Sequence, residues 1–197
     1  MEDPPVLNNI MRLKIIMLLS FVMLIFVSLT NKRYVLVIDD GGIRIDSISL
    51  VVIDGSINIS FLQKALNEQY SFFDDSLFVY PYYFFKKTSL VCLAASDDKQ
   101  AITSLKLYLN PVNEEPDRIN KKTKIDFLLN GYRITDKTTF HDILKCCSLK
   151  NFKVDTAING DNNVLKLRNA TYSIVFSFNT HNKITTIDIF PWGNFDR

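Results

Sequence analysis

Residues 172–190, YSIVFSFNTHNKITTIDIF, decide the fold of this chain. Tyr172–Phe178 and Ile184–Phe190 each alternate apolar and polar residues, and a polar turn at Asn179–Lys183 separates them. Alternation with a period of two is typical of strands that bury one face. The stretch therefore predicts two antiparallel strands near the end of the chain.

The same pattern occurs earlier, in Ser89–Ala95, a polar turn at Ser96–Lys99 and Ile102–Leu109. The final strands match best, because ITSLKLYLNP and ITTIDIFP both alternate and both stop near a proline. The similarity between the two segments extends further and defines two copies of one pattern, from about Leu50 to Pro111 and from about Ile125 to Pro191. Such a repeat indicates one supersecondary unit used twice. Chance similarity between short strands is the alternative.

Each copy opens with a turn, Asp54-Gly55 or Asn130-Gly131, and continues into a short helix. We expect Ser60 to cap the first helix, and Thr138 or Thr139 to cap the second. The apolar residues expected to share a buried face are Phe61, Leu62, Ala65 and Leu66 in the first helix, and Phe140, Ile143, Leu144 and Cys147 in the second. Further strands are expected at Leu77–Phe85, Phe152–Ile158 and Val164–Leu167, and a separate hairpin at Tyr34–Ile45 turns at Asp39–Gly42.

These patterns predict an α+β protein. An N-terminal transmembrane helix is followed by two similar small units, each a short helix packed on a mainly antiparallel sheet. The expected divisions are a tail and signal-anchor at residues 1–33, a first unit at 34–111, a linker at 112–123 and a second unit at 124–197. The linker is inferred from the composition of NPVNEEPDRINKKT at Asn110–Thr123.

The membrane prediction depends on Ile15–Leu29, IIMLLSFVMLIFVSL, which contains no charge. As a helix it would span roughly 22 Å, which is short for a hydrocarbon core of about 30 Å. A cleaved signal peptide and a buried core helix are therefore alternatives. We favour an uncleaved anchor over residues 15–30, because no A-x-A site follows the apolar run. Translation from Met11 would leave a basic MRLK start.

Orientation in the membrane is weakly specified. Arg12 and Lys14 precede the apolar run, and Lys32 and Arg33 follow it, so the positive-inside rule gives almost no bias. We expect a single-pass protein whose folded part lies outside the cytoplasm, because a short N-terminal tail precedes a long C-terminal part.

Composition and motifs argue against several chemistries. Lys and Arg total 23 and Asp and Glu total 21, so no basic surface predicts a nucleic-acid partner. His141 and His181 lack a second histidine at metal-binding spacing. Cys92, Cys146 and Cys147 are expected to be small buried residues, or Cys92 to form a disulfide with one of the pair. Asp39–Gly42 indicates a hairpin turn rather than a calcium loop. No catalytic, metal or cofactor-binding residue is expected.

The segment Leu77–Phe85, LFVYPYYFF, is apolar or aromatic at every position except the proline. A strand with one wet face should alternate. Either both faces are covered in the fold, or one face meets a partner. The pattern favours the covered strand. Because Pro81 favours a sheet edge and aromatic residues dominate protein interfaces, a partner site is kept as a hypothesis. The four candidate residues are Phe78, Tyr80, Tyr82 and Phe84.

The second copy, with its Thr138-Thr-Phe-His-Asp-Ile-Leu helix before a meander, resembles small bacterial envelope domains. It is also loosely similar to the small lipoprotein of the outer-membrane barrel-assembly machinery. That family shows Leu-Gly-x-Pro after the helix and a lipidated cysteine, whereas this chain has Cys147–Lys150 there and no such cysteine. The resemblance covers about 65 residues and implies an envelope location and a binding role.

The expected function is a non-enzymatic, membrane-anchored extracytoplasmic protein-binding module, for example an inhibitor of the immunity-protein kind. The expected partners are the lipid bilayer, through residues 15–30, and another protein, without nucleic acid or a small-molecule cofactor. A structural or assembly component of the cell envelope is the alternative, and an unrecognised hydrolase is the least favoured.

Overall fold

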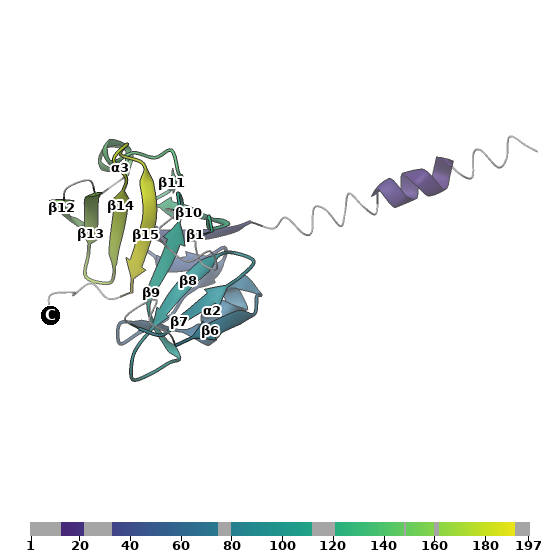
Figure 1. The fold of residues 1–197 in the computed structure, drawn as a ribbon, viewed down its shortest axis with the longest axis horizontal. Coiled ribbons are helices and arrows are strands. Elements are labelled where there is room, and N and C mark those ends of the chain that lie inside the picture. The colour runs from purple at the N-terminus through teal and green to yellow at the C-terminus, as the bar shows by residue number, and fades with distance from the viewer. Residues whose placement is uncertain are drawn as a thin grey trace, which may run out of the picture. The chain divides into compact units, whose positions relative to one another are not determined.

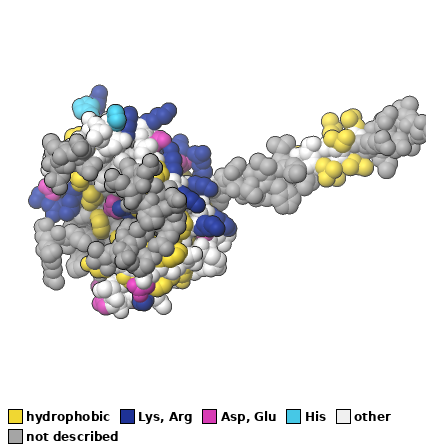
Figure 2. All heavy atoms as spheres, in the orientation of Figure 1, with side chains coloured by type: hydrophobic (Ala, Val, Ile, Leu, Met, Phe, Trp, Pro, Cys, Tyr) yellow, Lys and Arg dark blue, Asp and Glu magenta, His cyan; other side chains and the backbone are white. Residues whose placement is uncertain are grey.

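The computed structural model describes residues 13–21, 33–74, 80–111, 121–147, 149–159 and 162–191. The chain divides into two compact units, Met1–Arg33 and Tyr34–Arg197. In the first unit, residues 13–21 form a helix whose apolar side chains are all 50–68% exposed (Figure 2). In the part of the chain that the structure describes, no helix is both long and apolar enough to cross a bilayer. The predicted anchor extends to residue 30, and its residues 22–30 lie outside the described part.

The second unit contains two similar series of elements. The first series is β1 (Tyr34–Asp39), β2 (Gly42–Ile45), β3 (Ile48–Ser49), β4 (Val52–Ile53), β5 (Ser56–Asn58), α2 (Ile59–Leu66), β6 (Tyr70–Phe73), β7 (Tyr82–Phe85), β8 (Leu90–Ala94) and β9 (Ala101–Tyr108). The second series is β10 (Ile125–Leu129), β11 (Tyr132–Ile134), α3 (Phe140–Cys146), β12 (Lys153–Asn159), β13 (Asn162–Arg168), β14 (Ser173–Phe178) and β15 (Ile184–Phe190).

These strands form two sheets (Figure 1). The smaller has the order β11-β10-β1-β2-β3, and the larger has the order β12-β13-β14-β15-β9-β8-β7-β6, with β4 and β5 attached through β9. Among the described strands, β1 and β10 are the parallel pair, and all other pairs are antiparallel. The predicted α+β class with mainly antiparallel sheet is confirmed.

Each series runs through a hairpin, a helix and a four-strand meander, and the two meanders meet at β9 and β15. The opening hairpin of the first series is β1–β2, which turns at Asp39–Gly42. The predicted repeat instead paired Asn130-Gly131 with Asp54-Gly55, and Asp54-Gly55 is the turn that joins β4 to β5. That match was wrong because short Asx-Gly turns look alike. The β4–β5 hairpin has no counterpart in the second series.

The helix caps follow the prediction in one case. Thr139 caps α3 in a capping box with Asp142, as expected for one of the two threonines. The cap of α2 is Asn58 rather than Ser60. The Asn58 side-chain oxygen accepts a hydrogen bond from the Ser60 N–H at 2.9 Å. The prediction missed Asn58 because Ser60 also fits an N-cap pattern.

One hydrophobic core runs through both series and lies on the helix side of the larger sheet. Leu62, Leu66 and Ile143 are fully buried, as predicted. Phe61 and Leu144 are 36% and 39% exposed, so their predicted burial was wrong. Both helices are short, and the buried stripe of each is narrower than the apolar pattern suggested. The expected units 34–111 and 124–197 share this core and the larger sheet.

Cys92 on β8 and Cys147 after α3 are buried. Burial raises the pKa of the Cys92 thiol, so it stays protonated at neutral pH. Both behave as small buried residues, and the alternative disulfide between them is not formed. The side chain of Cys146 lies outside the described part.

Candidate functional site

The predicted partner residues do not form one surface. Tyr80 is 48% exposed, whereas Tyr82 and Phe84 are 0% and 7% exposed. Phe78 lies outside the described residues. Tyr82 and Phe84 pack with Val91 and Tyr108 in a small cluster on the face of the larger sheet opposite the main core. Both faces of β7 are covered, which is the interpretation that the sequence pattern favoured.

The edge of the sheet is one strand further out than predicted. β6 pairs with β7 in antiparallel register, Phe72 opposite Tyr83 and Phe73 opposite Tyr82, and is the last described strand at this end. In any sheet, the outermost strand presents a row of backbone N–H and C=O groups on its open side. β6 was not predicted, because its four residues, YSFF, show no alternation of apolar and polar side chains.

Aromatic rings support this edge. The Tyr70 ring meets the Tyr83 ring edge-on at a centroid distance of 4.8 Å, and the Phe72 and Tyr83 rings lie 5.0 Å apart. Phe72 remains 38% exposed. An aromatic ring that is held by neighbours and still open to solvent offers contact area with little loss of side-chain entropy.

Lys99 completes the surface. Its Nζ atom lies 5.1 Å from the centroid of the Phe72 ring and 3.0 Å from Asp74 Oδ2. The Tyr83 hydroxyl donates to the Lys99 carbonyl oxygen at 2.6 Å. Burial raises the pKa of Tyr83, so its hydroxyl remains a donor at neutral pH. We call Tyr70, Phe72, Tyr83 and Lys99 the aromatic edge.

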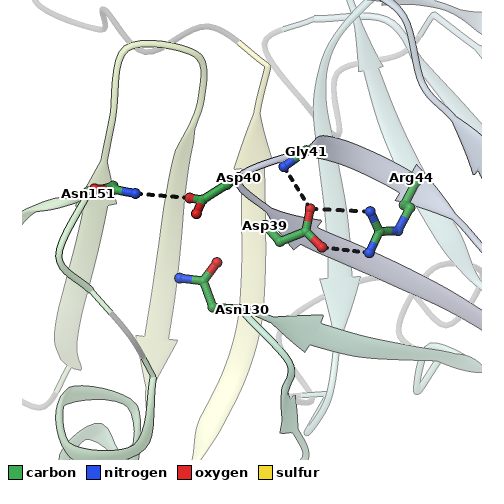
Figure 3. A pocket seen from close by; sticks show the side chains of 6 residues that line it. All are labelled: Asp39, Asp40, Gly41, Arg44, Asn130 and Asn151. Atoms are coloured by element: carbon green, nitrogen blue, oxygen red, sulfur yellow. Dashed lines mark hydrogen bonds and ion pairs between the residues drawn. The ribbon is translucent and has the colours of Figure 1, made fainter.

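A second feature is an open polar recess of about 470 Å³ (Figure 3). Because β1 and β10 are parallel, their hairpin turns lie at the same end of the smaller sheet, and they line the recess with Asp39, Asp40, Gly41 and Asn130. Arg44 from β2 and Asn151, which precedes β12, complete the lining.

Internal bonds occupy the carboxylates of this recess. Arg44 Nη2 donates to Asp39 Oδ2 at 2.5 Å, and the Gly41 N–H donates to Asp39 Oδ1 at 2.9 Å. Asn151 Nδ2 donates to Asp40 Oδ1 at 3.0 Å (Figure 3). The Asn151–Asp40 bond connects the β1–β2 turn to the second series, and the other two lie within the β1–β2 hairpin. The predicted hairpin turn is confirmed, and the bonds give the recess a structural role.

Other reactive side chains lie apart. No group of three His, Cys, Asp or Glu side chains within the described ranges is placed to hold a metal ion. His141 is exposed on α3, while Cys147 is buried, so these two do not form a nucleophile and base. His181 is exposed in the β14–β15 turn.

Comparison of the chain with models of known families, with curated proteins and with solved structures finds no match in any of the three.

Proposed function

We propose that residues 34–191 form a protein-binding module that captures an extended segment of another protein along β6. The observation that carries this proposal is an outermost strand beside an exposed, supported aromatic ring, Phe72. A peptide that adds a strand to a sheet gains main-chain hydrogen bonds, and its alternate side chains find neighbouring contacts. In this arrangement Phe72 and Tyr80 contact the partner, and Lys99 supports the Phe72 ring.

The N-terminal segment supplies the proposed location. The apolar side chains of residues 13–21 are exposed around the whole helix, and exposure of apolar surface to water costs about 25 cal/mol per Å². We propose that residues 15–30 tether the module to a membrane, with its folded part outside the cytoplasm. A membrane tether joined to a protein-binding strand fits an inhibitor of the immunity-protein kind, which neutralises an incoming protein.

Phe72 and Phe61 provide a matched pair for testing the binding site. They are 38% and 36% exposed, but Phe61 lies on α2 rather than at the sheet edge. A photo-crosslinking residue replaces Phe72 in one variant and Phe61 in another, each in the full-length chain in native membranes. We expect a defined protein adduct from position 72 and none from position 61.

Phe72→Ser and Phe61→Ser extend the comparison. Phe72→Ser should abolish recovery of that adduct partner with only a small fall in melting temperature, because it removes the ring contacts with Tyr83 and Lys99. Phe61→Ser should leave recovery intact. Equal adducts from both positions, or full recovery with Phe72→Ser, would show that β6 is not the binding edge.

The membrane tether is tested separately. After cell lysis and carbonate extraction, full-length protein should remain with the sedimented membranes, and Leu18→Arg should shift it to the supernatant. Protein that stays in the supernatant with its N-terminal residues intact contradicts the tether and leaves the binding edge unaffected.

A further inference from the structure

Among the described strands, β12 is the last of the larger sheet on the side away from β6. Lys153, Thr156 and Ala157 are exposed along this strand, and Val154 is 39% exposed. β12 pairs with β13 over seven residues, which is longer than the four-residue pairing of β6 with β7. A long exposed edge strand invites pairing with another strand.

The charges on β12 are arranged symmetrically about Val154. Lys153 precedes it and Asp155 follows it, and both lie on the face opposite the main core, with Arg168 and Lys166 as their cross-strand neighbours on β13. Arg168 also forms an ion pair with Asp155. Lys153 therefore lies directly opposite a like charge, Arg168, which disfavours the pair.

We propose that β12 pairs antiparallel with β12 of a second copy of this chain, with the two-fold axis at Val154. In this register, Lys153 of each copy lies opposite Asp155 of the other, twice across the interface. The second copy's Asp155 then balances Lys153 and Arg168. On the core side of the sheet, the two Val154 side chains contact each other at the axis and become buried.

Charge distinguishes this register from its neighbours. An axis at Lys153 or at Asp155 would place two like charges directly opposite each other, which disfavours pairing. An axis at Thr156 would place Lys153 opposite Asn159 and Asp155 opposite Ala157, and would leave both charges unmatched. The axis at Val154 satisfies all four charges.

A charge exchange tests the proposal. In Lys153→Glu, two carboxylates face each other at both positions, and in Asp155→Lys two ammonium groups do so. Changing two attractive cross-strand pairs to repulsive ones should weaken self-association of the full-length chain by about tenfold in either variant. A mixture of the two variants restores opposite charges at both positions and should form a heterodimer with wild-type strength.

Heterodimer formation with wild-type strength in the mixture also shows that both variants are folded. Self-association that is unchanged in the single variants overturns the register. A wild-type chain that stays monomeric, measured in detergent by sedimentation, overturns the proposal itself.

Cysteine cross-linking gives an independent result in membranes. Directly opposite residues of an antiparallel pair have Cβ atoms about 4.5–5.5 Å apart. A disulfide needs Cβ atoms about 3.5–4.5 Å apart, so a small inward shift of the two strands allows the bond to form. In a Cys146→Ser background, Val154→Cys should form a disulfide-linked dimer of the chain on mild oxidation, and Thr156→Cys should not. A dimer through Thr156→Cys alone, or cross-linking of Val154→Cys only to a different protein, overturns the proposal.

Discussion

Glu68 carries a carboxylate that is only 5% exposed, between α2 and β6. Its two oxygens accept from the backbone N–H groups of Lys87 and Thr88, the latter at 3.2 Å, and so hold the β7–β8 turn. Glu68→Ala leaves both donors without an acceptor, which should lower the free energy of unfolding by about 2 kcal/mol. Glu68→Gln keeps one acceptor oxygen and should lose less. Urea titration measures both, and equal stability of all three proteins would contradict this role.

Asp142 provides a pH-dependent contribution in the α3 capping box. The Thr139 backbone N–H donates to Asp142 Oδ2 at 2.8 Å, and the Thr139 hydroxyl donates to the same oxygen at 2.7 Å. These bonds, the backbone one first, lower the pKa of Asp142 in the folded protein. A lowered folded pKa stabilises the fold fully above the unfolded value of about 4, and the gain is lost as pH falls through the folded pKa.

Asp142→Asn should therefore have a lower free energy of unfolding than the wild type at pH 7, and this difference in free energy should shrink below about pH 4. Urea titrations across this range measure it. Asp97→Asn, in the exposed turn before β9, controls for the loss of one charge. A difference that is constant with pH would show that the Asp142 carboxylate contributes no linked protonation.

At the scale of the elements, the β10–β11 turn sets the position of two strands. Asn130 and Gly131 both have positive φ, 48° and 81°, as a type I′ hairpin requires. A Cβ at Gly131 would meet no atom within 4 Å, so Gly131→Ala introduces backbone strain alone. We expect it to cost about 1–2 kcal/mol. Gly131→Asn should cost less, because Asn adopts the left-handed conformation more readily than Ala, and the reverse order in thermal unfolding would contradict this assignment.

The elements with strong local signals were predictable. β15 matches its predicted range, Ile184–Phe190, because its alternation is regular and Pro191 ends it. Thr139 carries a complete capping box within four residues. In contrast, the parallel pairing of β1 with β10 joins residues about ninety positions apart, and no local pattern encodes it.

The candidate site was only partly predictable, for a related reason. The apolar composition of LFVYPYYFF favoured a strand covered on both faces, as found for Tyr82 and Phe84, while Tyr80 is exposed. Composition does not show which strand is outermost, because that depends on where β6 pairs. Tyr82 and Phe84 are covered as a consequence of sheet order, and Phe72 takes the exposed position beside the edge.

At the scale of the whole molecule, the two series depend on each other through β9 and β15. These adjoining strands pair from Leu105 opposite Ile189 to Tyr108 opposite Thr186, and each is the last strand of its own four-strand meander. β1 and β10 join the series a second time in the smaller sheet. Either series alone would expose a face of the shared core and two additional strand edges, so we expect the second unit to unfold as one cooperative body.

Ile187→Ala tests this cooperativity. Ile187 is fully buried on β15, opposite Leu107 on β9 and Phe176 on β14. Removing its buried methyl groups should lower the free energy of unfolding by about 3 kcal/mol. If the two series unfold together, amide hydrogen exchange under conditions that report global unfolding should accelerate by the same factor in β8, which belongs to the first series, and in β13, which belongs to the second. Acceleration confined to β13 and β14 would show that the series unfold independently, despite the continuous sheet.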